Sequence, residues 1–215
     1  MIGSMAHSLD IIKHGRLPFN DALSLQDKMV AARRDGSIGD TLILLEHDPV
    51  YTIGRTRDRS SLREAATLPH PVIEINRGGK ATYHGPGQLV GYPILDLHTY
   101  GKDLHTYLRT LEKMLALTCA DFGISAGSRE GLTGVWVENR KLASIGVGVR
   151  HWISMHGFAI NVASDLSGFD AITPCGIQDV EMTSVSRECG REMSVDEFAD
   201  SLIPHVRRCL LELIA

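Results

Sequence analysis

The stretch from residue 135 to residue 162 alternates with a period of two and is broken twice by short turns. Such alternation is typical of half-buried strands, and short turns join antiparallel neighbours. We therefore expect a three-stranded antiparallel meander, with residues 141–149 as its middle strand. One face of that strand carries aliphatic side chains, and the other carries Ser144, Gly146 and Gly148.

Gly146 and Gly148 leave part of this sheet face without side chains. Glycine inside a strand weakens it, and its usual reasons are a bulge or the close approach of a ligand or of backbone. Two interpretations carry equal weight at this point. The glycines form either a bulge that relieves twist or the floor of a slot for an extended chain.

Three further stretches have the period of an amphipathic helix: residues 20–35, residues 103–121 and a segment that begins at Ser194. Ser194 is followed three residues later by Glu197, which is the pattern of a capping box. Pro204 predicts a kink in this last helix.

Shorter apolar runs lie between these segments. Residues 41–46 and 72–75 have the composition of buried strands, and residues 48–54 that of a turn with a short extended piece. Residues 88–95 are apolar enough for another strand. Pro93 places that strand near an edge or a bulge, because proline cannot donate to a strand ladder.

The composition is that of a folded chain, since 43% of the 215 residues are hydrophobic and 22% are charged. A net charge of −4 gives no general attraction to nucleic acid or to an anionic membrane. We find no internal repeat or linker and expect one domain over residues 1–215. No leader pattern and no apolar run of membrane-spanning length are visible, so a cytoplasmic location is expected.

Four cysteines are widely spaced, without a Cys-x-x-Cys pair, and the histidines form no compact ligand pattern, so no metal site is expected. Cys119 and Cys209 lie on or beside apolar helical faces, and Cys189 lies in a charged stretch. Cys175 follows Pro174 and precedes Gly176. Proline stiffens this loop, while glycine lets a substrate carbonyl come close and leaves its amide accessible as an oxyanion donor.

A nucleophilic cysteine needs a group that favours its thiolate. His84, His156, Lys141 or a helix N-terminus could serve Cys175 in this way. Composition and spacing do not choose among them.

Residues 77–88 form a glycine-rich segment with Tyr83 and His84 as polar contacts. A phosphate loop is excluded because no Gly-Lys-Ser/Thr is present, and a dinucleotide fingerprint is excluded by the glycine spacing. The alternative to a binding loop is a structural hairpin.

Five motifs in this order of the chain together resemble the lipoate–protein ligase B family, the octanoyl-[acyl-carrier-protein]:protein N-octanoyltransferases. They are EHDPVYTIG at residues 46–54, RGGKATYHGPGQ at 77–88, KLASIG at 141–146, HGFAINV at 156–162 and PCGI at 174–177. The resemblance covers about residues 20–190 and is specific, because several long motifs recur in order.

This resemblance implies an α+β, biotin/lipoate ligase-like fold: a large mixed β-sheet with a smaller sheet and packed helices. It implies a catalytic dyad of Cys175 and Lys141. The acyl pocket implied by the family comprises Arg77, Gly78, Gly79, Lys80, Ala81, Thr82, Tyr83, His84, Ser144, Ile145, Gly146, Gly157, Phe158 and Ala159.

The implied reaction transfers octanoyl from octanoyl-acyl carrier protein, through a Cys175 thioester, to a lysine of lipoyl domains, as the first step of endogenous protein lipoylation. The implied acceptors are the lipoyl domains of 2-oxoacid dehydrogenases and the glycine cleavage H protein, and neither ATP nor a metal is needed. The backbone of Gly176 and of Gly78-Gly79 would supply oxyanion donors. A basic run steers the carriers or is merely a solvated loop; it comprises Arg55, Arg57, Arg59 and Arg63.

Three other functions are weighed against this one. An ATP-dependent lipoate or biotin ligase would not need a cysteine, and the sequence Pro174-Cys175-Gly176 argues against it. A lipoyl relay enzyme would take its acyl group from the lysine of another protein. A non-catalytic carrier-binding module would form no acyl adduct.

Overall fold

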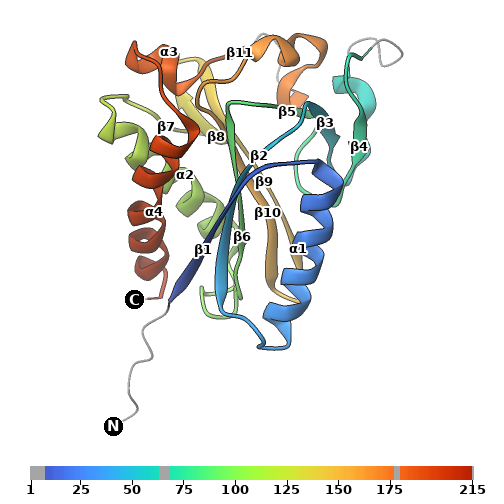
Figure 1. Ribbon diagram of the computed structural model, residues 1–215, viewed down its shortest axis with the longest axis vertical. Helices are drawn as coiled ribbons and strands as arrows, with labels where there is room; N and C mark the ends of the chain where they lie inside the picture. Colours follow the sequence, from blue (N-terminus) through green and yellow to red (C-terminus); the bar gives the residue numbers. More distant parts are fainter. Residues whose placement is uncertain (1–7, 63–67, 177–179, 215) are drawn as a thin grey trace.

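A computed structural model describes residues 8–62, 68–176 and 180–214, in which an eight-stranded sheet and a three-stranded sheet are packed with helices (Figure 1). The large sheet has the order β1 (Leu9–Leu17), β2 (Asp40–His47), β6 (Gln88–Ile94), β10 (Ile153–Asn161), β9 (Arg140–Arg150), β8 (Leu132–Val137) and β7 (Gly127–Arg129). Strand β11 (Glu181–Met182) pairs with β9, and the small sheet has the order β4 (Val72–Glu74), β3 (Val50–Ile53), β5 (Thr82–His84). Parallel pairs, such as β1–β2 and β9–β11, accompany antiparallel ones, so the predicted α+β class with a mixed large sheet and a smaller sheet is confirmed.

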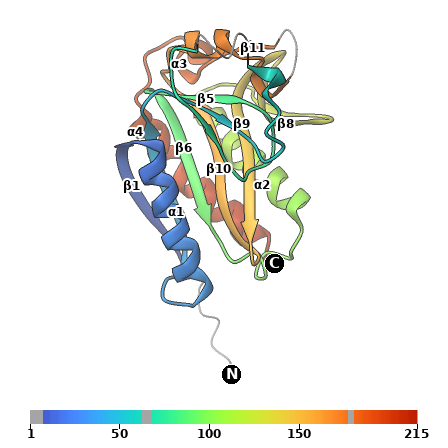
Figure 2. The same cartoon turned by 90° about the vertical axis from the view of Figure 1, so that its right-hand side faces the viewer.

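Helices cover both faces of the large sheet (Figures 1 and 2). Helix α1 (Phe19–Arg34) packs on one face, where Ala22 and Val30 contact apolar side chains of β2, β6 and β10. Helices α2 (Leu104–Asp121) and α4 (Val195–Glu212) pack on the other face over the largest core cluster. The small sheet lies across one end of the large sheet, above the start of α1 (Figure 2).

The three predicted helices are confirmed to within one or two residues. Asp103 caps α2, because its carboxylate accepts from the backbone of His105 and Thr106. Ser194 caps α4 as predicted, through Glu197 N–H. The carboxylate of Glu197 instead accepts from Arg191, so the second half of the expected capping box is replaced by an ion pair.

The predicted meander is confirmed as β8, β9 and β10, but β9 contains a bulge that the alternation does not reveal. Val135 and Trp136 are consecutive on β8, whereas their partners on β9 are Ala143 and Lys141. Leu142 is therefore the extra residue, and Leu142 and Ala143 are both buried in the α2/α4 core. The bulge turns Lys141 to the face opposite that core, where its ammonium lies over the Trp136 ring.

Strand β6 lies in the middle of the sheet, between β2 and β10, so the expectation of an edge position is wrong and the alternative of a local irregularity holds. Its pairing with β10 stops at Gly91. Beyond that point the Ser154 side chain bridges the strands: its hydroxyl donates to Pro93 O (2.7 Å) and accepts from Leu95 N–H (3.0 Å). Proline fits here because no ladder bond is required of it.

Of the predicted buried strand at residues 72–75, residues 72–74 form β4 of the small sheet, and of these four residues only Ile75, just after the strand, is buried. Val72 and Ile73 are half-buried and Glu74 is exposed, because β4 is the edge of that sheet. The short extended piece expected within residues 48–54 is β3, the fully buried middle strand.

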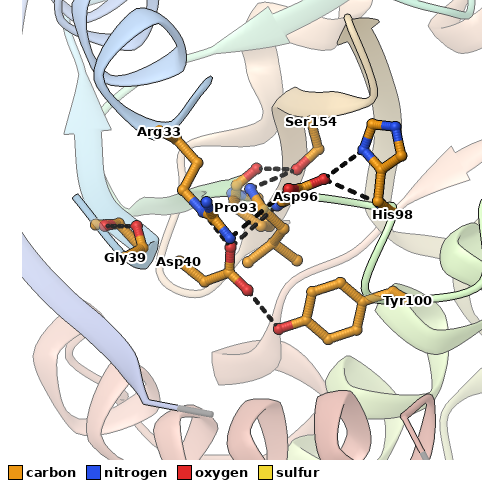
Figure 3. Close-up of polar contacts among 10 residues, drawn as sticks. Arg33, Gly39, Asp40, Pro93, Asp96, His98, Tyr100 and Ser154 are labelled. Atoms are coloured by element: carbon orange, nitrogen blue, oxygen red, sulfur yellow. Dashed lines mark hydrogen bonds and ion pairs between the residues drawn. The ribbon is translucent and has the colours of Figure 1, made fainter. Parts of the chain in front are cut away.

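A buried polar cluster ties the large sheet together at the end away from the small sheet (Figure 3). The Asp40 carboxylate accepts from Arg33 Nε (2.7 Å), from Asp96 N–H (3.0 Å) and from Tyr100 Oη (2.7 Å). Three donors from three segments satisfy this charge, which is the condition under which a buried carboxylate is tolerated.

Within the described residues, none of the helices has the length and apolar character needed to cross a membrane.

Candidate active site

A narrow pocket of about 50 Å³ lies between the α1 face of the large sheet, the start of α1 and the small sheet. Its lining residues are Phe19, Ile75, Arg77, Gly79, Thr82, His84, Val90, Tyr92, Ser144, Ile145, Gly146, His156, Gly157, Phe158 and Ala159.

The glycines of β9 are needed because another backbone segment lies on them. A Cβ on Gly146 would come within 2.8 Å of Gly78 O, and one on Gly148 within 2.7 Å of Asn76 O. Gly78 N–H donates to Val147 O at 3.0 Å, which fixes this contact. The pairing of β9 with β10 is continuous through Gly146 and Gly148, so the interpretation of these glycines as a bulge is wrong. The sheet face at Gly148 is instead covered by the protein's own backbone at Asn76.

Arg77 is buried and forms part of the pocket wall. Its guanidinium donates to Thr52 O (2.9 Å), to Thr52 Oγ1 (2.8 Å) and to Gly78 O (2.9 Å). These bonds attach residues 77–79 to β3, so the guanidinium fixes the loop over the β9 glycines.

Two buried histidines in the pocket wall are neutral at physiological pH. Burial, the neighbouring His47 and Arg77 lower the pKa of His84 to about 3, against a favourable bond to Gln88. Burial and the charge of Arg77 lower the pKa of His156 to about 4. His156 has φ +55°, and its backbone N–H donates to the Gln26 side chain of α1 (2.7 Å).

A line of buried hydrogen bonds runs from His84 toward the strand of Lys141. His84 Nδ1 bonds Gln88 Oε1 (2.8 Å), Gln88 Nε2 donates to Asn161 Oδ1 (2.9 Å), and Asn161 Nδ2 donates to Thr183 O (3.0 Å). Thr183 N–H in turn donates to Lys141 O at 3.0 Å. The amide orientations are mutually consistent, so His84 carries its proton on Nδ1.

Lys141 is 1% exposed and lies on β9 three residues before Ser144, beyond the lining of the pocket. Its Nζ donates to Thr133 O (3.3 Å) and lies 5.0 Å from the centre of the Trp136 ring. The lysine nitrogen therefore lies against two electron-rich partners, a carbonyl oxygen and an aromatic face.

The backbone of Cys175 belongs to the short 3-10 turn η3 (Pro174–Gly176), and its side chain lies outside the described residues. The chain on the far side of this turn returns to β9, where Met182 of β11 pairs with Lys141. The Gly176 amide donates to Thr173 O (2.9 Å), and the Gly78 amide is engaged with Val147 O. The expectation that these two amides are free oxyanion donors is therefore wrong for this conformation.

The structure brings together ten of the fourteen residues predicted for the pocket, namely Arg77, Gly79, Thr82, His84, Ser144, Ile145, Gly146, Gly157, Phe158 and Ala159. Gly78, Lys80, Ala81 and Tyr83 are not among its lining residues. Tyr83 points to the other side of β5, against Tyr51 and Phe169. Lys80 forms an ion pair with Asp58 (3.1 Å).

Five lining residues were not predicted for the pocket: Phe19, Ile75, Val90, Tyr92 and His156. Val90 and Tyr92 alternate on β6, so the period-two pattern assigns them to one face. Only the strand order shows that this face meets Ser144 and Ala159. Phe19 enters from α1, and no local pattern indicates that contact.

In the described part of the chain, no group of three or more His, Cys, Asp or Glu side chains is placed to hold a metal ion.

Comparisons with known proteins assign the chain to a family. The family model of the lipoyl protein ligase A/B catalytic domain matches residues 18–207. A curated protein of Geobacter sulfurreducens named octanoyltransferase is 50% identical over 189 residues, which are 88% of this chain and 79% of that protein.

Solved structures show the same fold. A bipartite lipoate protein ligase from Thermoplasma acidophilum superposes with a TM-score of 0.74 at 19% identity, covering 95% of this chain and 85% of that one. A biotin protein ligase from Leishmania major gives a TM-score of 0.55 at 10% identity, covering 95% and 75%. The predicted biotin/lipoate ligase-like fold is confirmed, and the chain belongs to the lipoyl protein ligase A/B family as a member of its lipoate–protein ligase B branch.

Proposed function

We propose that this protein is an acyltransferase that moves an octanoyl group onto a lysine of lipoyl domains through a thioester on Cys175. The observation that carries the proposal is 50% identity to an octanoyltransferase over 88% of the chain. The pocket beside β9 and β10 supports it, since a mostly apolar slot suits a medium-length acyl chain. We propose that residues 1–215 act as one catalytic domain.

In the first step, Lys141 as an ammonium favours the Cys175 thiolate, because an opposite charge nearby stabilises an ion in a water-poor site. The thiolate attacks the carbonyl carbon of the donor thioester and forms a new carbon–sulfur bond. The bond to the phosphopantetheine sulfur breaks, and the departing thiolate takes a proton from Lys141.

In the second step, the acceptor amine attacks the acyl-enzyme carbonyl. A carbon–nitrogen bond forms, the bond to Cys175 breaks, and neutral Lys141 accepts the proton that the amine loses. A thioester is exchanged for a more stable amide, so the reaction needs neither ATP nor a metal ion. Full activity after EDTA treatment and without ATP tests this part.

Intact mass spectrometry after mixing with octanoyl-acyl carrier protein tests the dyad. We expect an octanoyl adduct on the wild-type protein and none on Cys175→Ser or Lys141→Ala. Cys189→Ser and Lys113→Ala are matched controls, because Cys189 is half-buried at the end of α3 (Val185–Cys189) and Lys113 is exposed on α2; both should acquire the adduct. An adduct on Cys175→Ser at the wild-type rate would reject Cys175 as the nucleophile.

The proposed donor is octanoyl-acyl carrier protein, and the proposed acceptors are the lipoyl domains of 2-oxoacid dehydrogenases and the glycine cleavage H protein. No nucleic acid or membrane partner is proposed, and the cytoplasmic location stays a prediction.

The basic run is a proposed steering surface for the acidic carriers. Arg55 is exposed, whereas Arg57 (3.5 Å) and Arg59 (2.9 Å) pair with Glu74, which offsets part of their charge; Arg63 lies outside the described residues. Reversing Arg55, Arg57 and Arg59 to Glu should raise the KM for the carrier several-fold at low salt, with little effect at high salt. An unchanged KM would leave the run as a solvated loop.

A further inference from the structure

A buried carboxylate stands on the opposite side of the sheet from Lys141. Glu112 is on α2, is 2% exposed and packs against β8. Its Oε1 accepts from Gly134 N–H (2.9 Å), and its Oε2 accepts from Arg109 (2.6 Å). A buried carboxylate is costly without such partners, so its position needs a reason.

The peptide unit that donates to Glu112 also accepts a hydrogen bond from Lys141. Gly134 N–H and Thr133 O belong to one peptide bond, and Lys141 Nζ donates to Thr133 O at 3.3 Å. The carboxylate and the ammonium therefore bind opposite ends of a single amide within β8. Bonds arranged in such a line polarise one another, so the carboxylate makes the carbonyl oxygen a better acceptor for the ammonium.

Gly134 allows this arrangement. Its φ is +133°, and a Cβ there would come within 2.5 Å of Ala143 O and 3.1 Å of Lys141 Cε. A side chain at this position would push the lysine away from the carbonyl. The Trp136 ring, next but one along β8, lies under the same ammonium.

We propose that Glu112 is a positioning residue that holds Lys141 through the Thr133–Gly134 peptide, so that carboxylate, peptide and ammonium form one line of interactions. The inference rests on the proposed role of Lys141. It extends to a lysine the general arrangement in which the group that activates a nucleophile is oriented by a third group.

The test compares Glu112→Leu with Glu112→Gln. Leucine removes the acceptor for Gly134 N–H, whereas glutamine keeps an oxygen in its place. Two rates are measured: octanoyl adduct formation at neutral pH, and iodoacetamide alkylation of Cys175 from pH 5 to 10. We expect Glu112→Leu to slow adduct formation about 10-fold and to move the alkylation midpoint to higher pH, with Glu112→Gln restoring most of both.

Met114→Ala is the control for stability, because Met114 is fully buried on the same helix and has no carboxylate to bind the Gly134 amide. It should destabilise the fold and leave the alkylation midpoint at its wild-type value. If Glu112 has only a structural role, Glu112→Leu will likewise lower stability and leave the alkylation midpoint unchanged. That result would overturn the inference.

A double-mutant cycle with Lys141→Ala separates this inference from the proposed function. If Glu112 acts through Lys141, Glu112→Leu has no further effect on either rate in the Lys141→Ala background. Additive effects overturn the positioning role alone. A wild-type alkylation midpoint in Lys141→Ala itself overturns the proposed dyad.

Discussion

Two histidines and an arginine share the wall of a mostly apolar pocket. Arg77 carries the charge, and its contacts with Thr52 and Gly78 keep it fixed. His84 and His156 stay neutral because burial and this guanidinium both oppose a second positive charge. Of these three side chains, only Arg77 is therefore a cation at neutral pH.

This neutrality predicts a loss of stability in mild acid. An unfolded histidine binds a proton below pH 6.5, whereas folded His156 does so only near pH 4. The unfolded state thus holds more protons between these values, and stability falls as the pH decreases from 6.5 to about 4. His156 alone accounts for up to about 3 kcal/mol.

Urea unfolding at pH 7 and pH 5 measures this effect. His156→Asn should reduce the pH dependence by up to about 1.4 kcal/mol per pH unit, and asparagine tolerates the positive φ at this position. An identical pH dependence in wild type and variant would contradict the assignment.

The sequence motifs predict which residues belong to the site but not which way their side chains point. His84 and Gly146 are recognised from the glycine-rich motifs, and both line the pocket. Tyr83 is included with them although its neighbours Thr82 and His84 share the opposite face of β5. The ring of Phe158 likewise packs in the α2/α4 core, over Gly91.

At the scale of elements, β11 and α3 (Val185–Cys189) anchor the chain that follows Cys175. Glu188 of α3 accepts from Arg140 Nε (2.8 Å) and Nη2 (3.1 Å), and from Thr183 Oγ1 (2.6 Å). The Arg140 hydrogen bond lowers the pKa of Glu188, so this carboxylate is charged at neutral pH. The anchor lies one residue from Lys141 on β9.

Glu188→Gln is expected to loosen this anchor. Exchange of the Thr183 amide, which donates to Lys141 O, should become about 10-fold faster, because a charged hydrogen bond contributes about 1.5–3 kcal/mol. Octanoyl adduct formation should slow several-fold. Glu138→Gln is the control, since Glu138 contacts Arg140 while 76% exposed and should change neither measurement.

Long periodic elements are predictable from this sequence, and short ones are not. The helices and the meander follow from apolar spacing over many residues. Strands β7 and β11 contain three and two residues, so only their partners β8 and β9 define them. The bulge at Leu142 could not be predicted for the same reason, because it is defined by the pairing of β9 with β8 and by no pattern within β9.

At the scale of the molecule, the pocket lies against the small sheet, and the Asp40 cluster drawn in Figure 3 lies toward the opposite end of the large sheet. The cluster joins α1, β2 and the segment after β6, far from the small sheet. Its contribution is therefore to folding, while the other end carries the site.

Asp40→Ala tests whether the Asp40 cluster contributes to stability and not to activity. Removing the carboxylate leaves Arg33 and Tyr100 without their shared partner, so the free energy of unfolding should fall by about 3–5 kcal/mol. Activity per folded molecule should stay within twofold of wild type. Asp200→Ala, which breaks an exposed pair with Lys13, should cost at most about 1 kcal/mol in the same urea titration.

The sheet order could not be predicted from local patterns. Placing β6 between β2 and β10 joins segments more than forty residues apart, and such pairings leave no periodic trace. The α+β class was inferred from family motifs, and three of the five motifs, at residues 77–88, 141–146 and 156–162, contribute lining residues to the pocket.

The residues that lie on the β9 glycines belong to the loop between β4 and β5 of the small sheet, and the glycines belong to the large sheet. A substitution in the segment 75–84 can reshape this side of the pocket while the core under α2 and α4 keeps its packing. The fold thus permits a change of bound group without a change in the core, and a ligase, a transferase and a biotin enzyme can share it.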